Sequence, residues 1–187
     1  MSKARLEAFS DGVFAVIITI MVLELKVPHG ADWEAFRSLL PVFLTYILSY
    51  VFIGIYWSNH HHLMQVIDRV NGASLWANLH LLFWLSLVPF TTGWMGENHF
   101  AALPTAMYGG VLFMAGVAYL IFEGRLLRCG NPRLAAAVGN DIKGKASAVL
   151  YLTAIPLAFV NQLIADGIYV CVALMWLVPD RRIEKQL

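Results

Sequence analysis

The first hydrophobic stretch, residues 5 to 26, constrains the fold of this chain most strongly. It begins at Arg5, and every position from Val13 to Leu23 is apolar except Thr19. As an α-helix rising about 1.5 Å per residue, it would extend about 33 Å and cross a hydrocarbon core about 30 Å thick. The stretch is therefore predicted to be a membrane-spanning helix.

A secretory signal peptide is the competing interpretation of this stretch, because Lys3 and Arg5 precede the apolar residues. A signal peptide lacks acidic residues in its basic region and ends at small residues that a peptidase cleaves. Glu7 and Asp11 contradict the first property, and the Leu-Glu-Leu-Lys sequence at residues 23 to 26 contradicts the second. These residues favour a retained membrane helix.

The composition supports a membrane protein. Of the 187 residues, 59% are hydrophobic and only 13% are charged, and the mean hydropathy is +0.67. Soluble domains usually contain about 25% charged residues, so this deficit favours an integral membrane protein that uses residues 1–187 as one domain. The formal net charge of +1 gives no indication of a nucleic-acid partner.

The apolar segments predict an all-α integral membrane protein with six transmembrane helices per subunit. The segments are residues 5–26, 38–58, 74–94, 101–123, 146–162 and 164–179. The last two are short for a full crossing, which needs about 20 residues, so a single bent or re-entrant hairpin is the alternative there.

The distribution of basic residues predicts the orientation. If the N-terminus is cytoplasmic, all of the 13 Lys and Arg residues except Lys26 and Arg37 fall on the inner side of the membrane. Cytoplasmic loops of membrane proteins carry such an excess. We therefore expect a multi-pass protein of the cell membrane with cytoplasmic N and C termini.

Polar side chains gather near the inner ends of the first three predicted spans. They share a depth in the inner third of the membrane, and they are Arg5, Ser10, Asp11, Trp57, His60, His61, Asn78 and His80. Arg5 and Asp11 lie about 240° apart around one helix, so each needs a partner on another helix. Because an unpaired carboxylate is unfavourable at that depth, we predict a hydrogen-bonded structural network around Asp11.

The triplet from His60 to His62 also raises the possibility of a metal site. Consecutive helical residues point about 100° apart, and the chain contains neither HExxH nor a histidine pair at i, i+4, so no metal site is predicted. Ser10 beside Asp11 lacks a GxSxG elbow, so no enzyme is predicted either. A membrane-embedded metalloenzyme stays an alternative that a metal assay on the purified protein would test.

Residues 91 to 96, Thr-Thr-Gly-Trp-Met-Gly, faintly resemble the TVGYG filter of potassium channels. A filter of that kind follows a short pore helix and lies in a re-entrant loop between two spans. Here the residues end a full-length apolar segment, so we expect a helix end with Trp94 at the membrane interface.

Arg5, Phe9, Ser10 and Asp11 match the RxxxFSD signature that opens the first helix of the lysosomal potassium channel family known as transmembrane protein 175. The chain resembles this family through all six spans, strongly in the first three and only in pattern beyond residue 125. Further similarities are residues 12–15, Tyr56-Trp57, His60-His61, Asn78 and Pro89-Phe90. Prokaryotic members carry one such unit and assemble as tetramers, so the resemblance implies a homotetramer.

The resemblance also implies that helix one lines a central pore with no re-entrant filter. The family's constriction lies five places after the signature aspartate, which is Val16 here, and Thr19, Ile20 and Leu23 follow on the same stripe. Their helical spacing of 0, 3, 4 and 7 agrees with one face. Val16, Ile20 and Leu23 are expected to form apolar gating rings, and Thr19 a ring of oxygens for selectivity.

The sequence thus predicts a homotetrameric, potassium-selective cation channel in membrane lipid, with potassium as the permeant ion and no cofactor. The alternative is a secondary transporter or a proton-conducting path that uses Asp11 and the inner-leaflet histidines, whose charge changes near neutral pH. Transporters often contain broken helices in two related halves, and this chain lacks that pattern.

Overall fold

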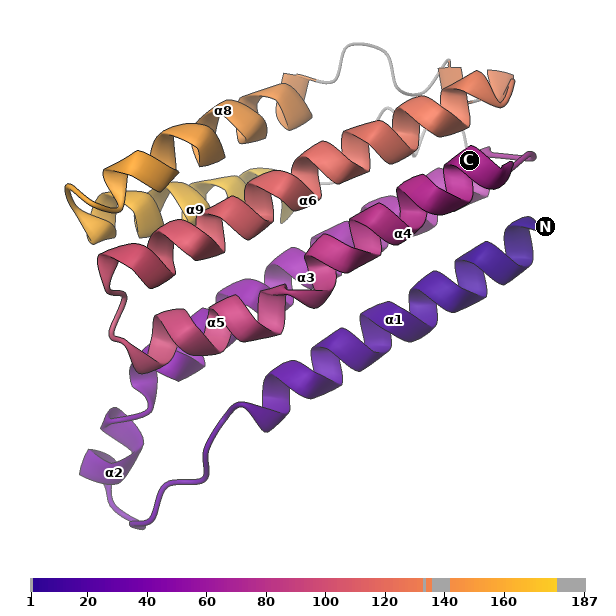
Figure 1. Ribbon diagram of the computed structural model, residues 1–187. Coiled ribbons are helices and arrows are strands. Elements are labelled where there is room, and N and C mark those ends of the chain that lie inside the picture. The colour runs from indigo at the N-terminus through magenta and orange to yellow at the C-terminus, as the bar shows by residue number, and fades with distance from the viewer. Residues whose placement is uncertain (1, 133, 136–141, 178–187) are drawn as a thin grey trace.

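The computed structural model describes residues 2–132, 134–135 and 142–177, and all regular structure in these residues is helical. The all-α prediction is confirmed. The longer helices run along a common direction (Figure 1). The elements are α1 (Lys3–Leu23), α2 (Trp33–Arg37), α3 (Leu40–Val66), α4 (Gly72–Ser86), α5 (Val88–Glu97), α6 (Ala102–Arg128), α8 (Ile142–Leu157) and α9 (Gln162–Leu177).

Four helical stretches among the described residues are long and apolar enough to cross a membrane. They are Lys3–Leu23, Leu40–Val66, Gly72–Glu97 and Ala102–Arg128. α8 and α9 contain 16 residues each. At about 1.5 Å per residue each extends about 24 Å, so the fifth and sixth crossings stay predictions. Residues 178–179 of the last predicted span, and the predicted cytoplasmic C-terminus, lie outside the described residues.

The third predicted span consists of two helices rather than one. α4 ends at Ser86 and α5 begins at Val88, with Leu87 between them. Pro89 has no N–H to donate to the carbonyl of Leu85, and its ring would clash with that carbonyl in a continuous helix. The filter-like residues 91 to 96 are helical within α5, as expected for a helix end.

α3 extends well beyond its predicted end at residue 58. The polar residues that suggested an end are part of the helix, which continues to Val66. Leu63, Met64 and Val66 are buried in the core, so their packing stabilises the helical turns after the histidines. The histidines consequently lie inside α3 rather than at its end.

Two clusters of buried side chains hold the bundle together, and they leave α1 at its edge. One cluster joins α1, α3, α4, α5 and α6, and the other joins α3, α5, α6, α8 and α9. α1 packs chiefly against α3, α4 and α5. It lies along one side of the bundle in Figure 1. Only one face of α1 is therefore covered by its own chain.

α9 approaches α6 closely at Gly109. A Cβ atom at Gly109 would lie 2.0 Å from the hydroxyl oxygen of Tyr169, and that hydroxyl donates to the Thr105 carbonyl at 3.1 Å. We expect Gly109→Ala to displace Tyr169 and to lower the free energy of unfolding by about 1–3 kcal/mol. Thermal unfolding in detergent measures this. Gly110→Ala is the control, because a Cβ there has no neighbour within 4 Å. Equal melting temperatures for the two variants would contradict the prediction.

Candidate functional site

α1 has one buried face and one uncovered face. The buried face consists of Leu6, Ser10, Phe14, Ile17 and Met21. These residues recur every three or four positions, as expected for one side of a helix packed against neighbours.

The stripe predicted from the sequence lies on the uncovered face of α1. The exposed fractions of Val16, Ile20 and Leu23 are 55%, 42% and 78%, and Thr19 is exposed as well. A row of apolar side chains on a membrane helix that its own chain leaves open is available to lipid or to other subunits.

Thr19 is the one hydroxyl-bearing residue of this stripe. Its Oγ1 donates to the carbonyl of Val16 at 2.9 Å. The bond uses the hydroxyl hydrogen and leaves oxygen lone pairs free to accept. The side chain therefore presents an oxygen, rather than a hydrogen, on the uncovered face of α1.

A buried row of hydrogen bonds joins α1 to α4 and α3. The Nδ2 of Asn78 donates to Ser10 Oγ at 2.9 Å, and Ser10 Oγ donates to the Leu6 carbonyl at 2.9 Å. His60 Nε2 lies 3.0 Å from Asn78 Oδ1, which can only accept, so this ring nitrogen is the donor. Three of the predicted network residues are thus brought together.

The row ends at His60. Its ring stacks on Phe122 with centroids 5.5 Å apart and meets the edge of Phe14 at 5.8 Å. The second ring nitrogen, Nδ1, is buried and has no hydrogen-bond partner among the described residues. These contacts make His60 a packed structural group.

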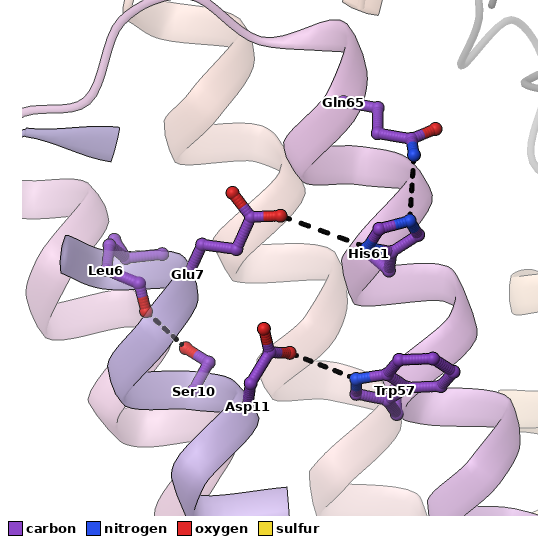
Figure 2. Close-up of polar contacts among 7 residues, drawn as sticks. All are labelled: Leu6, Glu7, Ser10, Asp11, Trp57, His61 and Gln65. Atoms are coloured by element: carbon purple, nitrogen blue, oxygen red, sulfur yellow. Dashed lines mark hydrogen bonds and ion pairs between the residues drawn. The ribbon is translucent and has the colours of Figure 1, made fainter. Parts of the chain in front are cut away.

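Asp11 pairs with Trp57 of α3. The indole Nε1 of Trp57 donates to Asp11 Oδ1 at 3.0 Å, as Figure 2 shows. The Trp57 ring also stacks on His61, with centroids 5.8 Å apart and an interplanar angle of 20°. Among the depth-matched donors considered from the sequence, the partner of Asp11 is the indole.

Two residues outside the predicted network complete the contact between α1 and α3. Glu7 Oε1 lies 3.8 Å from His61 Nδ1, and Gln65 Nε2 lies 2.7 Å from His61 Nε2 (Figure 2). Glu7 precedes Asp11 by four residues, and Gln65 follows His61 by four. That helical spacing is the signal from which both could have been found.

Arg5 and His80 differ from the prediction. Arg5 is exposed, and its side chain makes no hydrogen bond or ion pair with the rest of the described chain. It lies in the first turn of α1. His80 Nε2 accepts from Trp84 Nε1 at 2.9 Å within α4, so its bond stays inside one helix.

Asn131, which is not among the residues predicted from the sequence, is a polar anchor. Its Oδ1 accepts from the backbone N–H groups of Asp68 and Arg69 at 2.9 and 3.0 Å. Its Nδ2 donates to the carbonyls of Arg69 and Leu126 at 3.1 and 2.8 Å. The residue fixes the loop between α3 and α4 to the end of α6. An isolated asparagine after a helix carries no sequence signal for such a role.

A groove of about 940 Å³ opens between α1 and the α4–α5 segment. Val16 and Ile20 line one wall, and Phe90 and Trp94 line the other. Glu24 and Glu97 stand at the end of the groove where α1 and α5 terminate. Within the described residues, no three His, Cys, Asp or Glu side chains come together as a metal site would need.

Comparison with known proteins relates this arrangement to one family. Residues 5–89 match the model of the family described as endosomal/lysosomal potassium channel TMEM175. A potassium channel of Chryseobacterium sp. (strain P1-3) is 54% identical over 189 residues, covering 100% of this chain and 98% of that protein. A potassium channel of Streptomyces collinus is 34% identical over 175 residues, covering 85% and 84% of the two chains.

A solved structure has the same fold. It is the crystal structure of a lysosomal potassium-selective channel TMEM175 homolog from Chamaesiphon minutus. The TM-score is 0.80 at 28% sequence identity, and the alignment covers 95% of this chain and 97% of that one. The likeness thus extends beyond residue 125, through the region where the sequence patterns were weakest.

Proposed function

This chain belongs to the TMEM175 family, and on that premise we propose that it is a potassium-selective channel that conducts passively through a pore lined by α1. Members of this family are ion channels, so the chain is a multi-pass membrane protein and not an enzyme. Potassium is the permeant ion, in keeping with the names of the relatives.

The observation that carries the proposal is the uncovered stripe on α1. One helix face cannot enclose a pore, so several copies of α1 must surround a common axis. We propose a homotetramer in which Val16, Ile20 and Leu23 form apolar rings that gate by loss of water. The exposed fractions of these three residues, 55%, 42% and 78%, support this role.

Thr19 is proposed to supply the selectivity of the pore. Its hydroxyl donates within the helix, so four copies would offer oxygens to a partly dehydrated ion. Asp11 faces Trp57 on α3 and holds α1 at a fixed rotation, as do Ser10, Asn78 and His60. These residues position the pore helix and do not coordinate the ion.

The proposed topology has six crossings, with both termini cytoplasmic and the whole chain, residues 1–187, as one channel domain of the cell membrane. α8 and α9 are the short fifth and sixth crossings. Arg125, Arg128 and Lys143 lie on the side that this topology assigns to the cytoplasm. Lys26 belongs to the opposite side.

The bacterial relatives that match most of this chain are named potassium channels, which supports potassium conduction over the alternative of a proton path through Asp11 and the histidines. A relay needs a continuous row of exchangeable groups, and the row that starts at Ser10 stops at His60 Nδ1, which has no partner among the described residues. His61 belongs to a separate group with Glu7 and Gln65.

Potassium flux from liposomes tests the proposed function. Liposomes that contain the purified protein and potassium are expected to lose potassium into potassium-free buffer, and sodium-loaded liposomes to lose sodium much more slowly. Protein-free liposomes are the control. The mass of the same preparation in mild detergent should be that of a tetramer. A monomer that still conducts would rule out the central pore, and proton flux without potassium flux would favour the alternative.

A further inference from the structure

The C-terminal end of α1 carries a negative charge that does not stabilise the helix. α1 ends at Leu23, Glu24 is its C-cap residue, and the last turn contains no basic residue. The free carbonyls at a helix C-terminus form the negative end of the helix dipole, so a carboxylate there is unfavourable. The position of Glu24 therefore requires a reason other than the stability of α1.

Neighbouring charged groups leave the negative charge of Glu24 largely uncompensated. Lys26 pairs with Glu97 at the end of α5. The hydrogen bond and the charge of Glu97 raise the pKa of Lys26 most, and the charge of Glu24 contributes less. Glu24 is exposed, and its carboxylate forms no hydrogen bond or ion pair with the described part of the chain. The three groups together carry one net negative charge.

Glu24 adjoins the stripe of α1 that the proposed pore uses. It follows Leu23 directly and follows Ile20 by four residues, which places it about 40° from Ile20 around the helix. Glu24 and Ile20 line the same groove. In the proposed topology this end of α1 is the outer entrance of the pore.

We propose that the carboxylate of Glu24 attracts cations to the outer entrance of the pore. The Glu24 carboxylates of the subunits, together with the carbonyl ends of their α1 helices, raise the local potassium concentration without holding an ion in a site. This inference rests on the proposed function, because α1 must surround the pore for its charges to converge.

Lys26 limits this effect by neutralising Glu97. Removal of the lysine charge leaves the Glu97 carboxylate without its partner at the same end of the groove. Changes at Glu24 and Lys26 should therefore alter conductance in opposite directions. A general disturbance of the entrance would reduce conductance in both variants.

Single-channel conductance in planar bilayers tests the proposal at two salt concentrations. The Debye length is about 30 Å in 0.01 M KCl and about 3 Å in 1 M KCl, so a long-range field acts only in the dilute solution. In dilute KCl, we expect Glu24→Gln to lower the conductance several-fold and Lys26→Gln to raise it. In 1 M KCl both variants should conduct like the unaltered channel.

Glu34→Gln is the matched control. Glu34 lies in α2 at the same end of the molecule, is exposed, and has Arg37 3.9 Å away as its ion-pair partner. Glu34→Gln removes one negative charge, as Glu24→Gln does, but at a position away from α1. It should therefore leave the conductance unchanged.

Three results would overturn the proposal. They are a Glu24→Gln conductance equal to that of Glu34→Gln in dilute KCl, a reduction that persists in 1 M KCl, or no increase in Lys26→Gln. If Glu24→Gln does not assemble, the conductance of Lys26→Gln in dilute KCl tests the proposal by itself. If the unaltered protein passes no potassium, the proposed function fails, and that outcome is distinct from the three above.

Discussion

Replacement of Trp57 by phenylalanine is expected to destabilise the assembled protein by about 2 kcal/mol, the order of magnitude for a lost hydrogen bond to a charged group. Phenylalanine keeps the aromatic ring but removes the Nε1 donor that binds Asp11 at 3.0 Å. The Asp11 carboxylate is then left without its hydrogen bond at the contact between α1 and α3. We expect less tetramer on size-exclusion chromatography and a lower melting temperature in mild detergent.

Trp76→Phe is the matched control for this experiment. Trp76 lies in α4 and is 75% exposed, and its side chain makes no hydrogen bond to the described residues, so loss of its indole should have little effect. Asp11→Asn in the Trp57→Phe background should restore part of the stability, because a neutral amide is less unfavourable than a carboxylate in that environment. If Trp57→Phe melts like Trp76→Phe, the bond between Asp11 and Trp57 does not hold α1.

Replacement of Thr19 by valine is expected to reduce the preference for potassium over sodium about tenfold. That change corresponds to about 1.4 kcal/mol, on the order of one net hydrogen bond. Valine has the shape of threonine but lacks the oxygen that the proposed pore presents to the ion. The reversal potential with potassium on one side of the membrane and sodium on the other should move toward zero.

Thr153→Val in α8 is the matched control for the Thr19 variant. The Thr153 hydroxyl donates to the carbonyl of Leu150 at 2.8 Å, which is the same i−3 bond that Thr19 makes, and Thr153 is also exposed. Only its place in the fold differs. An unchanged reversal potential in open Thr19→Val channels would remove Thr19 from the selectivity mechanism.

The membrane class of this protein and the register of α1 could be predicted because both depend on local patterns. The length of an apolar run determines whether a helix can cross the bilayer. The spacing of Val16, Thr19, Ile20 and Leu23 determines that they share a face of α1. Neither property needs knowledge of another helix, and the structure agrees with both.

The break between α4 and α5 depends both on the local sequence and on tertiary packing. Pro89 is visible in the sequence, but prolines often occur within continuous membrane helices because neighbouring groups satisfy the freed carbonyls. Whether α4 and α5 stay continuous depends on how α4 packs against α6 and on how α5 packs against α3 and α6. For this reason the sequence predicts one continuous helix where the structure has two, although both belong to one candidate span, Gly72–Glu97.

The partners of the polar side chains were decided only by the tertiary structure. Several possible donors lie at the same depth in the membrane as Asp11. The rotation of α1 against α3 brings Trp57 to it. The same packing left Arg5 outside the network and brought Asn131 to the loop between α3 and α4. The sequence by itself determined which face of α1 is apolar, because helical periodicity is local. Which face is covered depends on contacts between residues far apart in the chain, and only the fold brings these together.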